Sequence, residues 1–171
     1  YVLFALAKRE KRTKYYLDYA AMRIPFFGKL IQKAALARMT RTLSSLFSSS
    51  VPILQALSIT ENVVENEVIS KVIRQARDSL ERGQSLAEPL KKHWAFPPLV
   101  TQMIAIGEET GALDAMLAKV ANFYEAEVDA GVERLKSLIE PLMILLLSGV
   151  VGTIIASIII PMYDIFNHIQ Q

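Results

Sequence analysis

The 171-residue sequence has no cysteine, two histidines and one tryptophan. Without cysteine the chain can form neither a disulfide nor a thiolate metal site. Neither His93 nor His168 stands in a metal-ligand spacing such as HExxH, and no GxxxxGK[ST] or GxGxxG phosphate loop occurs. The serines at positions 44, 45, 48, 49, 50 and 85 lack a nearby base, and no nucleophile, base and orienting residue can be assembled. We therefore expect no enzyme, no catalytic residue, no cofactor and no metal site.

Charge is absent from the segment between Pro141 and Tyr163, which reads PLMILLLSGVVGTIIASIIIPMY. As a helix, these 23 residues would be roughly 34 Å long, enough to cross the hydrocarbon core of a bilayer. The alternative is the buried core helix of a soluble protein. A signal peptide is excluded because the segment lies near the C-terminal end. The sequence predicts a transmembrane helix over 141–163.

Basic residues are concentrated at the opposite end of the chain. Residues 1–41 carry ten lysines and arginines against two acids, whereas residues 164–171 carry neither lysine nor arginine. The positive-inside rule then places residues 8–140 in the cytoplasm and the tail 164–171 outside. A polybasic segment of this kind is typical of a contact with membrane lipid. The uneven charge does not resemble a nucleic-acid footprint, and we expect no nucleic acid partner.

The first seven residues, YVLFALA, are apolar and stop at the cluster KREKRTK over residues 8–14. This pattern is typical of the cytoplasmic end of a preceding span with its stop-transfer cluster. A frayed apolar terminus is the alternative. Since the sequence starts without methionine, we expect it to be the C-terminal part of a longer protein, with residues 1–23 as the end of that span and a basic linker.

Residues 24–140 show helical rather than alternating periodicity, which predicts an all-α cytoplasmic domain. Short connections favour an antiparallel bundle of about six helices. The last and longest helix starts after Gly111 and continues into the transmembrane span, with a bend at Pro141 because proline removes a backbone donor.

Local signals predict where the shorter helices begin and end. A first helix covers 29–47. A second starts at Pro52 with Ser50 as its N-cap, and a third runs from the N-cap Asn66 to Gly83. A capping box over 85–88 predicts the start of a fourth helix, which ends near residue 92. A proline pair at 97–98 predicts the start of a fifth, which Gly107 ends.

A dense acidic motif follows, comprising Gly107, Glu108, Glu109, Gly111 and Asp114. One interpretation is a tight turn between helices, with the acids stabilising the next helix N-terminus by about 0.3–1 kcal/mol each. The other is a cation site or an acid pair that docks a partner, since carboxylates suit hard cations.

The predicted span adds two further candidates. Glu140 directly precedes Pro141 and either stays hydrated, finds a basic partner, or is simply the last cytoplasmic residue. Within the span, small residues recur every fourth position on two adjacent stripes: Ser148, Gly152 and Ala156, then Gly149, Thr153 and Ser157. We expect these stripes to pack on another span of the same protein, because small side chains let helices approach closely.

Four segments carry a resemblance to a known family: IPFFG at 24–28, VPILQAL at 51–57, MIAIGEETGALD at 103–114 and LIEP at 138–141. In this order they resemble the repeated F-domain of type II secretion system inner-membrane proteins and of type IV pilus platform proteins. Nearly the whole chain is covered. One departure is Ser50, where the family usually has glycine.

The family carries two such domains separated by two spans, followed by a third span, so this chain looks like the second copy with the last span. The resemblance implies a non-enzymatic, homo-oligomeric inner-membrane platform. Its implied partners are a hexameric assembly ATPase, pilin or pseudopilin, and other inner-membrane subunits of the machine. Secretion, pilus assembly and DNA uptake all remain open.

A mechanical hypothesis accompanies this resemblance. Residues 112–160 would act as one helical lever between the ATPase-facing bundle and the bilayer, with Pro141 setting its angle. A membrane-tethered helical adaptor or signalling domain is the alternative function, although neither coiled-coil heptads nor a modifiable histidine is evident.

Overall fold

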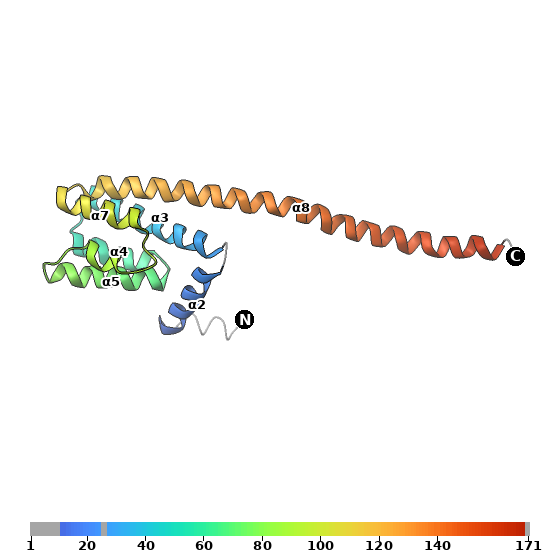
Figure 1. Ribbon diagram of the computed structural model, residues 1–171, viewed down its shortest axis with the longest axis horizontal. Coiled ribbons are helices and arrows are strands. Elements are labelled where there is room, and N and C mark those ends of the chain that lie inside the picture. The colour runs from blue at the N-terminus through green and yellow to red at the C-terminus, as the bar shows by residue number, and fades with distance from the viewer. Residues whose placement is uncertain (1–10, 25–26, 170–171) are drawn as a thin grey trace. The chain divides into compact units, whose positions relative to one another are not determined.

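The computed structural model describes residues 11–24 and 27–169, and all regular structure over them is helical (Figure 1). The predicted all-α class and the long final helix are confirmed. Over these residues there are seven helices, one more than the six or so expected: α2 (Lys11–Arg23), α3 (Phe27–Ser48), α4 (Ile53–Val63), α5 (Glu67–Glu81), α6 (Ala87–Lys91), α7 (Pro98–Thr110) and α8 (Leu113–Ile169). The apolar segment 1–7, predicted to end a preceding span, lies outside the described residues.

The chain divides into two compact units, 1–129 and 130–171, with the boundary inside α8. The first unit has an aliphatic core to which α3–α8 all contribute. Fully buried side chains include Leu36, Leu57, Ile73, Ile104 and Leu117. Burying one such side chain stabilises the fold by about 1.5–3 kcal/mol. A void of ≈ 10 Å³, about the space of a single water, lies among core side chains that include Leu57, Ile73, Ile104 and Leu117.

The segment predicted to be a basic linker is helix α2, which packs on α3 and α5. Met22 is buried, and the Asp18 carboxylate accepts a hydrogen bond from the Glu67 backbone N–H at 2.8 Å, at the start of α5. A Cβ at Gly28 would lie 2.1 Å from the Met22 carbonyl oxygen, so only glycine permits this approach of α3 to α2. Helix α2 is therefore part of the bundle.

The signals for the two ends of α5 are confirmed. Asn66 Oδ1 accepts the backbone N–H of Ile69 at 3.1 Å, as an N-cap does. At the other end Gly83 has a φ of +72°. The backbone N–H of Gln84 then reaches back to the carbonyl of Ser79 at 3.0 Å, which is the Schellman closure of a helix.

The predicted N-cap role of Ser50 is wrong. Pro52 occupies the N-cap position of α4, without a side-chain hydrogen bond. Ser50 instead closes α3 by the pattern that closes α5: its N–H bonds to the Phe47 carbonyl at 2.9 Å, and the Val51 N–H bonds to the Leu46 carbonyl at 3.0 Å. Its φ of +58° is left-handed, a conformation that costs a residue with a Cβ roughly 1–2 kcal/mol. A glycine, which the resemblance implies at this position, would avoid this cost.

Candidate functional site

Glu108, the first acid of the predicted motif, turns into the protein near the C-terminal end of α7. Its Oε1 accepts the backbone N–H of Leu86 at 2.8 Å, and its Oε2 accepts the Ser85 hydroxyl at 2.7 Å and, more weakly, the Ala87 N–H at 3.4 Å. Backbone N–H groups at a helix start have no partner in their own helix and favour negative charge. Glu108 therefore fastens the start of α6 to α7.

The capping box predicted over 85–88 is wrong: Leu86, not Ser85, occupies the N-cap position of α6, and it makes no side-chain cap hydrogen bond. Ser85 Oγ accepts the Ala87 N–H at 3.1 Å. The carboxylate that accepts the Leu86 N–H is Glu108 rather than Glu88, which forms an ion pair with Lys92 at 3.2 Å. Local spacing identified the helix start, but this carboxylate comes from another helix.

The two glycines of the motif have different roles. Helix α7 does not end at Gly107, as predicted, but continues to Thr110, and Gly111 follows it with a φ of +69°. Gly107 is buried inside the helix, and a Cβ there would lie 3.0 Å from the Cα of Leu113. The absence of a side chain at Gly107 thus allows the beginning of α8 to pack closely against α7.

Glu109 and Asp114, the other acids of the motif, are exposed. Asp114 lies in the first turn of α8, where negative charge is favoured. Among the described residues there is no group of three or more acids or histidines placed to hold a metal ion. Glu108 is engaged within the chain, so a docking role for the motif stays a prediction that concerns Glu109 and Asp114.

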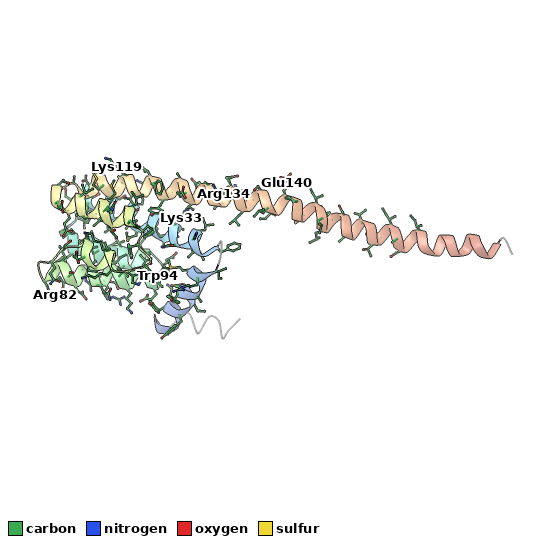
Figure 2. All side chains as sticks on the ribbon, in the orientation of Figure 1. Lys33, Arg82, Trp94, Lys119, Arg134 and Glu140 are labelled. Carbon is green, nitrogen blue, oxygen red and sulfur yellow. The ribbon has the colours of Figure 1, made fainter. Side chains whose placement is uncertain are left out.

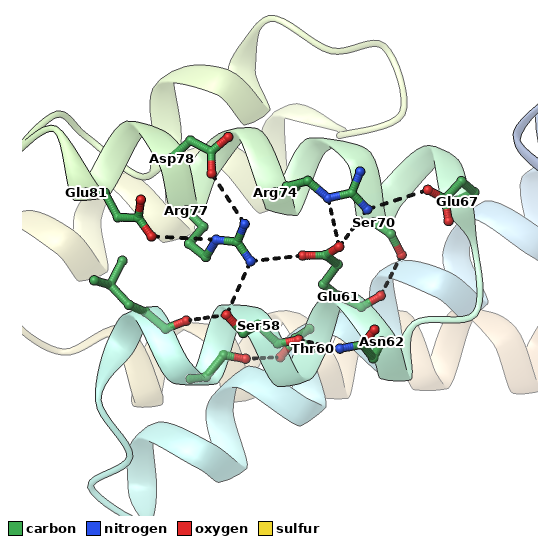
Figure 3. Close-up of polar contacts among 12 residues, drawn as sticks. Ser58, Thr60, Glu61, Asn62, Glu67, Ser70, Arg74, Arg77, Asp78 and Glu81 are labelled. Carbon is green, nitrogen blue, oxygen red and sulfur yellow. Dashed lines mark hydrogen bonds and ion pairs between the residues drawn. The ribbon is translucent and has the colours of Figure 1, made fainter. Parts of the chain in front are cut away.

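A polar cluster that the sequence reading missed joins α4 to α5 (Figure 3). Glu61 accepts hydrogen bonds from Arg74 at 2.6 and 2.8 Å and from Arg77 at 3.2 Å, and Arg74 also lies 3.6 Å from Glu67. The bond to Glu61 raises the pKa of Arg74. Because the Glu61 side chain is only 12% exposed, this cluster is worth more than a surface ion pair. The spacing of Arg74 and Arg77, three residues apart on α5, was the one sign of this cluster in the sequence.

Ion pairs also connect α3 to the first part of α8. Arg41 forms a two-pronged pair with Glu125, at 2.8 and 2.6 Å, and Lys33 pairs with Glu127. The hydrogen bond from Arg41 holds the pKa of Glu125 below its usual value. These side chains are about 40% exposed, so each pair contributes at most about 1 kcal/mol. They fix the register of α8 on the bundle rather than form a binding site.

His93 lies beside the core and not in a cluster of ligands. Its Nδ1 accepts the backbone N–H of Ala95 at 3.2 Å, which requires an unprotonated nitrogen. Burial, assisted by the charge of Lys71, lowers the pKa of His93. This arrangement is typical of a structural histidine.

In the second unit, the apolar side chains of α8 are exposed instead of buried. Leu145 is 73% and Ile144 61% exposed. Among the described residues α8 is the one helix long and apolar enough to cross a membrane, and none of its most apolar 18-residue window is buried in the protein. A soluble protein rarely exposes so long an apolar surface, whereas a bilayer would cover it. This favours the membrane interpretation over a buried core helix.

The small residues of the predicted stripes are open to their surroundings. A Cβ at Gly149 or Gly152 would meet no atom within 4 Å, and Ala156 is exposed. Three hydroxyls donate to the carbonyl four residues earlier, at 2.8, 2.8 and 2.9 Å; they belong to Ser148, Thr153 and Ser157. These hydroxyls can therefore sit in lipid without an unsatisfied donor. That another span packs here stays a prediction.

Glu140, labelled in Figure 2, is exposed on α8, and so is Pro141. The helix is continuous through both residues. The expected bend at Pro141 and the expected role of Glu140 remain predictions.

Comparison with known proteins agrees with these features. Residues 39–161 match the family model of type II secretion system (T2SS) protein F. The chain is 47% identical over 152 residues to type IV pilus assembly protein PilC of Thermus thermophilus, covering 88% of this chain and 37% of that protein. It is 39% identical over 167 residues to PilC of Myxococcus xanthus, covering 98% of this chain and 40% of that protein.

A secretion protein is also similar. Type II secretion system protein F of Xanthomonas campestris is 38% identical over 153 residues, which cover 90% of this chain and 38% of that protein. The chain thus spans about two fifths of the length of the relatives it matches. Since the family model covers most of its residues, including the GEETG motif and the Glu140–Pro141 junction, the chain belongs to the type II secretion system protein F family.

Proposed function

We propose that this chain is the membrane-anchored helical part of a non-enzymatic inner-membrane platform for type IV pilus assembly or type II secretion. The observation that carries the proposal is helix α8. Its N-terminal part contributes Leu117 to a closed core, whereas its C-terminal part exposes an uncharged apolar surface. Relatives named for pilus assembly, at 47% identity, and for secretion, at 38%, support a platform in either machine.

The proposed location is the inner membrane, with residues 8–140 in the cytoplasm and the tail outside. The uneven distribution of basic residues supports this orientation. The proposed partners are a hexameric assembly ATPase on the cytoplasmic side, pilin or pseudopilin in the bilayer, further inner-membrane subunits and a second copy of the chain.

The proposed mechanism is mechanical. A movement that the ATPase imposes on the helical bundle would reach the bilayer through α8, because the helix is uninterrupted from Leu113 to Ile169. Pro141 would set the angle of the span, and Glu140 would hold the helix at the aqueous boundary. The Glu140→Gln and Pro141→Ala variants are expected to reduce filament assembly or secretion while protein levels stay normal. Glu133→Gln, another exposed position of α8, is the matched control. Normal assembly in both variants would remove this junction from the mechanism.

The stripes of small residues are proposed to pack against another span. Gly149→Leu and Gly152→Leu would separate the helices, because the glycines leave room that a leucine fills. Both should lower the yield of a cross-link between this span and another span of the same protein, whereas Val150→Leu, between them, should not. Unchanged cross-linking in all three variants would exclude this packing.

The function itself is tested by affinity purification of the full-length protein from membranes of its own cells. The expected result is recovery of a hexameric ATPase and of pilin or pseudopilin. Recovery of a kinase or a receptor in their place would support the signalling alternative and contradict the platform.

A further inference from the structure

The outward side of α2 is unusually apolar for a helix so rich in cations. Tyr16 is 72% exposed, Leu17 is 38% exposed, and Ile24, just past the helix end, is 50% exposed. Ala20 lies between them and is exposed too. Because positions 16, 20 and 24 are four apart, they form one line along the helix. We call these four residues the outer face of α2.

An aromatic cluster borders this outer face. The Arg23 guanidinium lies 5.2 Å from the ring centre of Tyr19 and 5.8 Å from that of Trp94, and it donates a hydrogen bond to the Tyr19 hydroxyl at 2.8 Å. The two rings meet edge to face at 5.6 Å. Trp94 (Figure 2) belongs to the loop between α6 and α7 and remains 46% exposed. Exposed tyrosine and tryptophan beside cations are typical of side chains at a membrane–water boundary.

The charge of this region is positive on balance, although Asp18 and Glu65 line the same hollow as Lys14. Helix α2 carries four cations against one acid, Asp18, and that acid is committed to the backbone of Glu67. Glu65, the next acid nearby, pairs with Arg38 at 2.5 Å. The flanking cations Lys14 and Arg23 are therefore free of acidic competition within α2 and can attract an anionic surface.

The position of α2 in the chain decides between a lipid surface and a protein partner. Lys11 follows Ala7, the last residue of the apolar N-terminal run, by four residues. Four residues reach at most about 14 Å. If that run ends a membrane span, α2 begins within this distance of the bilayer, where an apolar stripe between cations is the pattern of an interfacial helix.

We propose that the outer face of α2, with Arg23, Lys14 and Trp94, docks on the anionic surface of the inner leaflet. The cations bind lipid phosphates, while Tyr16 and Trp94 enter the headgroup layer. The inference rests on the membrane location proposed above and adds a second, peripheral contact of the helical bundle with lipid.

Trp94 makes the test direct, because it is the single tryptophan of the chain. The full chain is reconstituted in nanodiscs of phosphatidylcholine, with and without phosphatidylglycerol, in which some lipids carry a quencher at the headgroup boundary. Quenching of Trp94 is expected to be several-fold stronger in the anionic discs. It should fall when salt is raised from about 0.1 to 1 M, because the Debye length shrinks from about 10 to 3 Å.

Three variants separate headgroup binding from chance proximity. Lys14→Glu and Tyr16→Ser each change an outer position without removing a contact of Trp94, and both should weaken quenching in anionic discs. Arg82→Glu is the matched control, since it makes the same charge change at an exposed position past the end of α5 and should leave quenching unaltered. Equal quenching in neutral and anionic discs, or none in either, would overturn the proposal. Shielding of Trp94 that occurs only after the assembly ATPase is added would overturn it in favour of a protein interface.

A carbonate-extraction assay on the same samples keeps the two proposals apart. A chain that resists extraction while Trp94 stays unquenched contradicts the docking of α2 and leaves the membrane span intact. A chain that is extracted contradicts the proposed function itself.

Discussion

Leucine is used in opposite ways in the two units of this chain. Leu36 in the first unit is completely buried, and Leu145 in the second is 73% exposed. In the first unit apolar side chains occupy one side of each helix and meet in a closed core. In the second they surround the helix. A helix that is apolar all round is stable only when an apolar medium covers it, so the two units are adapted to different solvents.

Polar groups show a less complete contrast. In the first unit some find partners on other elements, as Glu108 does with Ser85 and Glu61 does with Arg74, whereas the hydroxyls of Thr40 and Thr60 bond to carbonyls of their own helices. The described serine and threonine hydroxyls of the second unit all bond to carbonyls of their own helix, as Thr153 does to Gly149. Water tolerates an unpaired hydroxyl, but lipid does not. Self-contained hydrogen bonding is what a membrane-spanning helix requires.

The largest effect is expected when a leucine is shortened in the core. Leu36→Ala should lower the free energy of unfolding of the helical bundle by about 2–5 kcal/mol, because it removes buried methyl groups and leaves a cavity. Leu145→Ala, the same change in the second unit, should leave this free energy unaltered. Urea titration followed by circular dichroism of the reconstituted chain measures both. A comparable loss of unfolding free energy in the two variants would show that Leu145 lies in a protein core.

The next largest effect is expected from a charge in the apolar part of α8. Val151→Arg should oppose membrane insertion by about 2.5–3.5 kcal/mol, since a guanidinium is poorly tolerated at the centre of a bilayer. Ala126→Arg, an exposed position earlier in α8, should insert normally. The inserted fraction is read from carbonate extraction of cell membranes. Normal insertion of Val151→Arg would contradict a lipid environment for this part of the helix.

A smaller effect on the free energy of unfolding should distinguish the neighbouring acids Glu108 and Glu109. Glu108→Ala should cost the bundle about 1–3 kcal/mol, because it leaves backbone donors at the start of α6 without their charged acceptor. Glu109→Ala, an exposed neighbour, should change the free energy of unfolding by less than about 0.5 kcal/mol. If the two variants were equally stable, the hydrogen bonds of Glu108 would contribute nothing to the stability of the bundle.

The difference between Glu108 and Glu109 also marks the limit of sequence reasoning. Asn66 and Gly83 were predicted correctly because an N-cap and a helix-closing glycine act on backbone within a few residues. The long apolar helix was predictable because the absence of charge over 141–163 is read directly from the sequence.

Features that depend on contacts between distant helices could not be read locally. Glu108 and Ser85 are 23 residues apart, and nothing in the spacing of either predicts the pair. Gly107 was predicted to end a helix, but its lack of a side chain instead allows the start of α8 to pack closely against α7. The segment that forms α2 was interpreted as a linker because it is rich in cations, although its Met22 is buried. The departure at Ser50 was visible in the sequence, but its left-handed backbone was not.

The smallest expected effect concerns that backbone. Ser50→Gly should stabilise the bundle by about 0.5–1 kcal/mol, since relief of left-handed strain exceeds the entropy that glycine adds to the unfolded chain. Ser49→Gly lies beside it without a positive φ and should be neutral or destabilising. Thermal unfolding of the bundle compares the two. Destabilisation by Ser50→Gly would contradict the helix closure described for α3.

The central claim is that 141–163 crosses the bilayer with the helical bundle on its inner side. Because the chain has no cysteine, a single introduced thiol reports its own location without background. Ala126→Cys and Asn167→Cys are treated in intact cells with a maleimide reagent that passes the outer membrane but not the inner one. The account predicts that Asn167→Cys is labelled at once and Ala126→Cys only after the inner membrane is broken. Labelling of both thiols in intact cells, or of neither, would place the two positions on one side and contradict it.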